Sequence, residues 1–167
     1  MKEENVRLQC QEYNLSAVRT LPENGTPSPT VVMCHGWSRD KNGTKYKMLS
    51  EELAKNGISS LRFDFYGHGE SDGVLNDFTE SIGVKNLHHV IRHLQDNGCK
   101  NNSIGISGSS TGAQVAILYA VRNPEIGALA LRAPSYDYES LRIAEYIRSP
   151  TLIIAGEKDR LISPADA

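Results

Sequence analysis

The pattern of apolar and polar positions predicts two strands near the start of the chain and a buried strand after them. Over residues 6–18 the apolar positions have the spacing of strands, and residues 22–29 are rich in turn formers. Residues 30–34 then form a continuous apolar run, which is typical of a strand buried on both faces. We therefore expect two outer strands, a loop and the first strand of a sheet interior.

Helical and strand-like segments alternate along the rest of the chain. Tyr46, Leu49 and Leu53 indicate an amphipathic helix that Gly57 ends. The segments after it are a strand, a helix, a strand, a helix, a strand, a short helix and a strand, at residues 58–65, 79–95, 103–107, 111–122, 127–132, 138–147 and 151–155. This alternation predicts βαβ units, and hence an α/β fold with a mostly parallel sheet flanked by helices. Residues 1–167 show no linker, so a single domain is expected.

Composition narrows the class of protein. An apolar content of 39% in 167 residues excludes full disorder, and 18 basic against 20 acidic residues offer no footprint for nucleic acid or a membrane surface. Three cysteines are too few for a disulfide framework, and their spacing is not that of a zinc site. The start of the chain lacks the apolar region of a signal peptide, and the longest apolar run has seven residues. We expect a cytoplasmic protein with free thiols.

Catalytic or binding residues are expected at the carboxyl ends of the strands, because ligands bind there in open parallel sheets. Four strand ends carry unusual residues, at positions 35–37, 64–71, 108–112 and 156–159. The third is Gly108-Ser109-Ser110-Thr111-Gly112, a Gly-x-Ser-x-Gly sequence between a predicted strand and a predicted helix. A sharp turn there would project the hydroxyl of its central serine, and glycines two places away would let strand and helix approach closely. A glycine-rich turn of a nucleotide-binding fold is the alternative, but Gly-x-Gly-x-x-Gly is not found here.

These motifs resemble those of the α/β-hydrolase superfamily, in particular its lidless or small-lid serine esterase and aminopeptidase-like group. The resemblance runs from about Val31 to the last residue, with the four motifs in the order of that family. It implies Ser110 as nucleophile, Asp159 as the acid of the triad, and the backbone N–H groups of Trp37 and Thr111 as oxyanion hole. It also implies supporting roles for His35, Gly36, Gly108 and Gly112.

The sequence offers two candidates for the acid of this triad and no histidine in the expected place for the base. Asp159 could instead cap a helix, and Asp137 is a second candidate for the acid. The family order requires a histidine after the acid, but residues 160–167 contain none. We therefore expect seven strands, with the eighth strand and last helix of the family absent. Either the chain is a truncated hydrolase or a partner supplies the base.

None of the five histidines is an evident substitute for this base. His35 is expected to shape the oxyanion loop, and His68 belongs to a loop that packs beside the site in the family. His88, His89 and His93 are interpreted as a solvated or half-buried face of a helix, since no third metal ligand accompanies them. The chain is therefore expected to have low activity or none.

The resemblance implies hydrolysis of acyl esters, with a carboxylesterase of feruloyl or cinnamoyl type as the first choice. It implies no metal or organic cofactor. Only about 18 residues, 133–150, separate the last two predicted strands, so there is no separate lid domain. Thioesterase and aminopeptidase activities use the same elements, and a non-catalytic binding module of the same fold is the alternative from another class. Because the last strand would be an exposed edge, poor solubility or a homo-oligomer is also expected.

Overall fold

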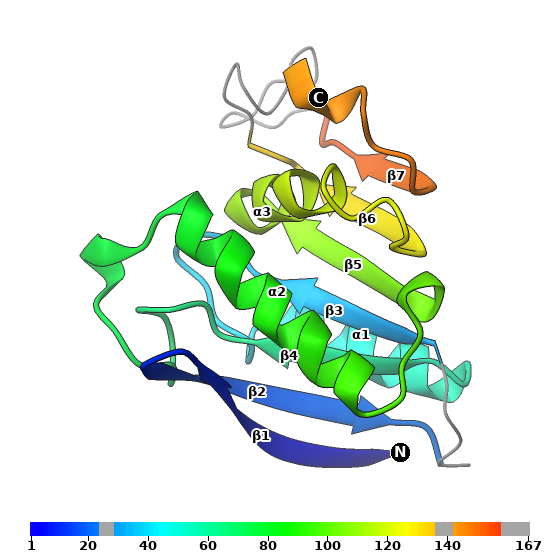
Figure 1. Cartoon of the computed structure of the whole chain (residues 1–167). Coiled ribbons are helices and arrows are strands. Elements are labelled where there is room, and N and C mark those ends of the chain that lie inside the picture. The colour runs from blue at the N-terminus through cyan, green and yellow to red at the C-terminus, as the bar shows by residue number, and fades with distance from the viewer. Residues whose placement is uncertain (24–28, 136–141, 158–167) are drawn as a thin grey trace.

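The structure, a computed structural model, describes residues 1–23, 29–135 and 142–157. Within these ranges seven strands form one sheet with the order β1-β2-β4-β3-β5-β6-β7 (Figure 1). The strands are β1 Lys2–Cys10, β2 Tyr13–Leu21, β3 Thr30–Cys34, β4 Ser59–Phe63, β5 Ile104–Ser109, β6 Ala128–Arg132 and β7 Thr151–Ile154. The α/β fold expected from the sequence is confirmed.

Strand pairing places the ends of β3 and β5 side by side in the middle of the sheet. The pairs β1 with β2 and β2 with β4 are antiparallel, whereas β4, β3, β5, β6 and β7 run parallel to one another. In the β3–β5 register, Cys34 lies opposite Gly108. The segments that follow these two residues therefore leave the sheet next to each other.

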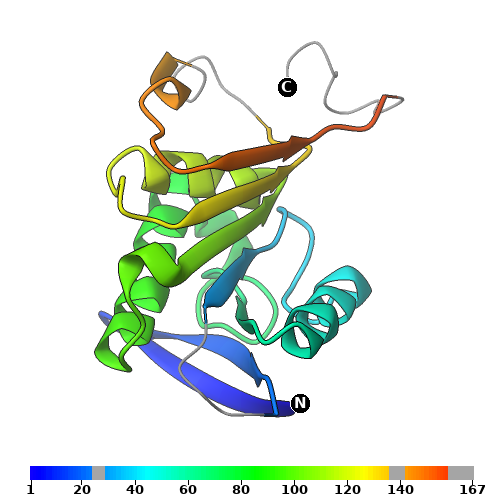
Figure 2. The same cartoon turned by 90° about the vertical axis from the view of Figure 1, so that its right-hand side faces the viewer.

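Helices cover both faces of the sheet. They are α1 Thr44–Lys55, α2 Glu80–Asp96 and α3 Thr111–Ala120, with two short 3-10 turns, η1 Leu75–Asp77 and η2 Asn101–Ser103. The two views show α2 and α3 on one face and α1 on the other (Figures 1 and 2). Thr79 caps α2, because its hydroxyl oxygen accepts a hydrogen bond from the Ile82 N–H.

The main hydrophobic core lies between the sheet and the α2–α3 layer. Its largest fully buried side chains come from both strands and helices, and include Phe63, Leu87, Ile91, Ile106 and Ile117. Along β5, Ile104, Ile106 and Gly108 are buried, and the residues between them are half-buried. This alternation directs one face of β5 into the core and the other toward the α1 side.

The predicted face of α1 is wrong in part. Leu49 was expected in the apolar stripe, yet it is 39% exposed, and the helix buries Tyr46, Ser50 and Ala54 instead. These three residues are four positions apart, which places them on one side of a helix. The sheet face beneath is polar here, since Ser50 Oγ lies 3.5 Å from a terminal nitrogen of the buried Arg62. A small polar residue fits this position better than leucine.

The remaining sequence-based elements agree with the structure to within a few residues. Of the helix predicted at 138–147, only residues 142–147 lie within the described ranges, and 142–144 are helical. No helix among the described residues is long and apolar enough to cross a membrane. Those residues also hold no cluster of three or more metal-ligating side chains.

Candidate active site

Ser110 occupies a sharp turn between β5 and α3. Its backbone angles are φ 52° and ψ −123°, a region that residues with a side chain rarely adopt. Hydrogen bonds hold this conformation, because the Ser110 N–H donates to the Arg132 carbonyl over 3.0 Å and the Ser110 carbonyl accepts from the Ala113 N–H over 2.8 Å. The serine therefore sits where strand becomes helix, in the strained geometry that the Gly-x-Ser-x-Gly sequence predicts.

The flanking glycines permit this turn because neighbouring backbone fills the space of a side chain. A Cβ atom on Gly108 would lie 2.6 Å from the Cα of Ala113, at the start of α3. A Cβ atom on Gly112 would overlap the carbonyl oxygen of Cys34, at the end of β3. Both positions therefore exclude any larger residue without movement of the backbone.

The loop after β3 packs directly against Ser110. A Cβ atom on Gly36 would lie 3.3 Å from the Ser109 carbonyl oxygen and 3.4 Å from Ser110 Cβ. The N–H groups of Trp37 and Thr111 have no acceptor among the described residues. Thr111 is the first residue of α3, and N–H groups there carry the positive end of the helix dipole. The turn thus combines a serine hydroxyl with two backbone donors that no described residue pairs.

His35 is a buried residue whose ring is fully engaged with backbone. Its Nε2 atom accepts the Phe65 N–H over 3.1 Å, which leaves the proton on Nδ1, 2.9 Å from the Gly36 carbonyl oxygen. Burial lowers the pKa of His35 to about 4, so the ring is neutral at pH 7. Because the Nε2 lone pair is occupied, His35 is not placed to act as a general base.

A buried ion pair joins the loop after β3 to the loop after β4, and the sequence did not point to it. Lys41 Nζ lies 2.6 Å from Asp64 Oδ2 and 2.6 Å from Glu70 Oε2, and Lys41 and Asp64 are almost completely buried. The Lys41 N–H also donates to Asp64 Oδ1 over 2.6 Å. Burial opposes the charge on Lys41, but its bonds to Asp64 and Glu70 outweigh this and raise its pKa. The bond to Lys41 lowers the pKa of Glu70.

The two acid candidates lie outside the described residues, and three of the histidines lie on α2. Asp159 and Asp137 lie outside the described residues. His88 is exposed on α2, and His89 and His93 are half-buried there, where burial lowers the pKa of each. No hydrogen bond links the Ser110 hydroxyl to a histidine within the described part of the chain.

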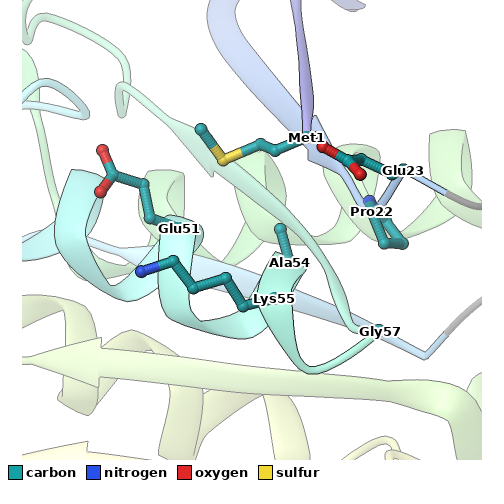
Figure 3. Close-up of a pocket in the computed structure, with 7 residues that line it drawn as sticks. All are labelled: Met1, Pro22, Glu23, Glu51, Ala54, Lys55 and Gly57. Carbon is teal, nitrogen blue, oxygen red and sulfur yellow. Dashed lines mark hydrogen bonds and ion pairs between the residues drawn. The ribbon is translucent and has the colours of Figure 1, made fainter.

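A cavity of about 530 Å³ lies near the opposite end of the strands from Ser110 (Figure 3). Pro22 and Glu23, after β2, line it together with Glu51 and Lys55 of α1 and Gly57 before β4. These residues border the amino end of β4, whereas Ser110 follows the carboxyl end of β5. The cavity therefore does not belong to the serine site.

Comparison with known proteins identifies the family. The chain matches the family model described as serine aminopeptidase, S33, over residues 25–141. The chain belongs to this hydrolase family. An acyl transferase from Aliivibrio fischeri (strain MJ11) is 33% identical to this S33 family member over 142 residues. The match covers 75% of this chain and 44% of the acyl transferase. The chain thus spans about half the length of the curated relatives that it matches.

Solved structures have the same fold as this S33 family member. An alpha-beta serine hydrolase homologue from Coxiella burnetii aligns with a TM-score of 0.86 and 25% identity, over 99% of this chain and 79% of the other. The ferulic acid complex of Est1E from Butyrivibrio proteoclasticus aligns with a TM-score of 0.83 and 21% identity, over 96% and 82%. These likenesses confirm the α/β-hydrolase architecture that the motif order indicated.

Proposed function

We propose that this chain carries the nucleophile and the oxyanion hole of a serine acyl hydrolase. The observation that carries the proposal is the strained conformation of Ser110, at the start of α3 and against the loop of Gly36. A serine hydroxyl at a strained strand-to-helix turn is the arrangement of a nucleophile elbow, in which the serine attacks an acyl group. Membership of a hydrolase family supports the same reaction class.

In the proposed reaction, Ser110 Oγ attacks the carbonyl carbon of an ester. The carbonyl oxygen becomes an oxyanion that accepts hydrogen bonds from the N–H groups of Trp37 and Thr111. The serine proton passes to the leaving alkoxide, whose loss as the alcohol gives an acyl-serine. Water then attacks the acyl-serine, which releases the acid and restores the serine hydroxyl. Loss of one such donor typically costs about 10²–10³ in rate, so the two N–H groups are a large part of the expected catalysis.

The serine must lose its proton during the attack, so the rate of acylation depends on a general base. We propose Asp159 as the acid that would orient a catalytic histidine. His35 and His68 are bonded to backbone atoms and the other three histidines lie on α2, so none serves as base in the described structure. We therefore expect the 167-residue chain to acylate slowly and to turn over weakly.

Acyl transfer is a second candidate, and the curated relatives favour it. Several proteins that match at 30–33% identity bear the name acyl transferase. In that reaction the acyl group on Ser110 passes to an acceptor other than water, with no change in the nucleophile or the oxyanion hole. The ratio of transfer to hydrolysis in the presence of an added alcohol or thiol separates the two candidates.

The proposal is tested by acylation of the protein itself. The chain is incubated with short-chain aryl esters, a feruloyl ester and an aryl thioester, and the modified residue is located by peptide mass analysis. We expect a Ser110 adduct that is lost in Ser110→Ala and kept in Ser107→Ala, a matched serine within β5. An adduct that persists in Ser110→Ala contradicts the proposal, and tight ligand binding without any adduct indicates a non-catalytic module.

A further inference from the structure

His68 is a buried histidine that the proposed reaction does not use. It lies in the loop after β4, is 6% exposed, and packs among aromatic rings. Its ring centroid is 5.0 Å from that of Phe78, 5.0 Å from that of His35 and 6.0 Å from that of Trp37. A polar ring in this apolar setting requires hydrogen bonds, because burial without them is costly.

Both ring nitrogens of His68 lie within hydrogen-bond distance of backbone carbonyl oxygens, on two different loops. Nε2 lies 2.7 Å from the carbonyl oxygen of Trp37, and Nδ1 lies 3.0 Å from that of Tyr66. A carbonyl oxygen can only accept, so a ring nitrogen must carry a proton to bond with it. We assign a proton to Nε2, toward Trp37, because that contact is the shorter of the two.

This contact fixes one of the two peptide planes on either side of the Trp37 Cα atom. The preceding plane contains the Gly36 carbonyl, which accepts from His35 Nδ1 over 2.9 Å and from the Arg39 N–H over 3.1 Å. That plane also contains the Trp37 N–H. The following plane contains the Trp37 carbonyl, which His68 holds. With both planes held, the two backbone dihedrals of Trp37 are held as well.

We propose that His68 is a positioning residue that, together with the bonds to the Gly36 carbonyl, holds the backbone of Trp37 in place and so keeps the Trp37 N–H in its direction, with Nε2 of His68 bonded to the Trp37 carbonyl. The proposal rests on the proposed function, in which this N–H receives the oxyanion. His68 does not exchange a proton with the substrate. Its contribution is preorganisation, because a donor must already point at the developing charge in order to stabilise it.

Two substitutions separate the hydrogen bond from the ring. Glutamine places an amide nitrogen near the position of Nε2 and can donate to the Trp37 carbonyl, whereas asparagine reaches only the position of Nδ1. Both H68Q and H68N remove the ring and its packing. His88 on α2 is exposed, so H88Q and H88N are matched controls.

The first test does not need activity. The chain contains a single tryptophan, so selective ¹⁵N-tryptophan labelling gives one backbone amide signal, that of Trp37. We expect an order parameter of about 0.85 for this amide in the unmodified chain and in H68Q, and below about 0.6 in H68N. Equal order parameters in H68Q and H68N overturn the proposal. An unprotonated Nε2 in the ¹⁵N-histidine spectrum of the unmodified chain also overturns it.

The second test measures the consequence for chemistry. The second-order rate constant for fluorophosphonate labelling of Ser110 is expected to fall at least about tenfold in H68N and to stay within about threefold in H68Q. Equal losses in both variants assign His68 to packing alone and overturn the proposal. If the unmodified chain is not labelled, the proposed function fails, and the Trp37 order parameter still decides the role of His68.

Discussion

Ser110 adopts a backbone conformation that residues with a side chain avoid, and the cost can be measured. Glycine accepts φ 52° and ψ −123° without strain, but alanine does not. We expect Ser110→Gly to have a free energy of unfolding about 1 kcal/mol above that of Ser110→Ala, by denaturant titration. At Ser81, on the exposed face of α2, glycine should instead be the less stable of the two. The same order at both sites would contradict strain at the turn.

His35 should make stability depend on pH. Its pKa is about 4 in the folded chain, against an ordinary value of 6.5 for histidine, so between these pH values the unfolded state binds more protons. The contribution of neutral His35 to the free energy of unfolding is therefore fully present above about pH 6.5. It is lost as the pH falls toward 4, by about 3 kcal/mol in total. Denaturant titrations across this range should show a shallower dependence in His35→Gln. Parallel curves for the two proteins would contradict the buried neutral state.

At the scale of elements, the strands were predictable and the connections between them were not. Runs such as Thr30–Cys34 are apolar because both faces of the strand are covered, and this pattern is local in the sequence. The Lys41–Asp64 ion pair and the His68–Trp37 bond join residues 23 and 31 positions apart, and no local signal shows which loops will meet. The buried face of α1 was misjudged at Leu49 for a related reason, because the polar sheet surface beneath it decides which residues face inward.

The close approach of β3, β5 and α3 predicts a sharp difference between two glycines. Gly112→Ala should lower the free energy of unfolding by more than about 2 kcal/mol, because its Cβ would overlap the Cys34 carbonyl. Gly105→Ala should change it by less than about 1 kcal/mol, since the nearest atom to that Cβ is 3.6 Å away. Thermal and denaturant unfolding measure both. Similar losses at the two positions would contradict the packing described at the turn.

At the scale of the whole molecule, β7 is the most exposed part of the sheet. Leu152, Ile153 and Ile154 are 46–58% exposed, and one side of β7 has no partner strand within the described ranges. Edge strands of this kind pair readily with other chains. We propose that two copies of this chain associate through β7, and that sedimentation shows a mass that rises with concentration. Leu152→Lys should weaken this association, and a monomer at every concentration would contradict it.

The central claim is that Ser110 is the nucleophile of an acyl-transferring site, and active-site labelling tests it most directly. The chain is treated with a fluorophosphonate, and the phosphonylated residue is identified by mass spectrometry of its peptides. We predict one modified residue, Ser110, with no labelling in Ser110→Ala and normal labelling in Ser107→Ala. Modification of a different residue, or undiminished labelling of Ser110→Ala, would contradict the account.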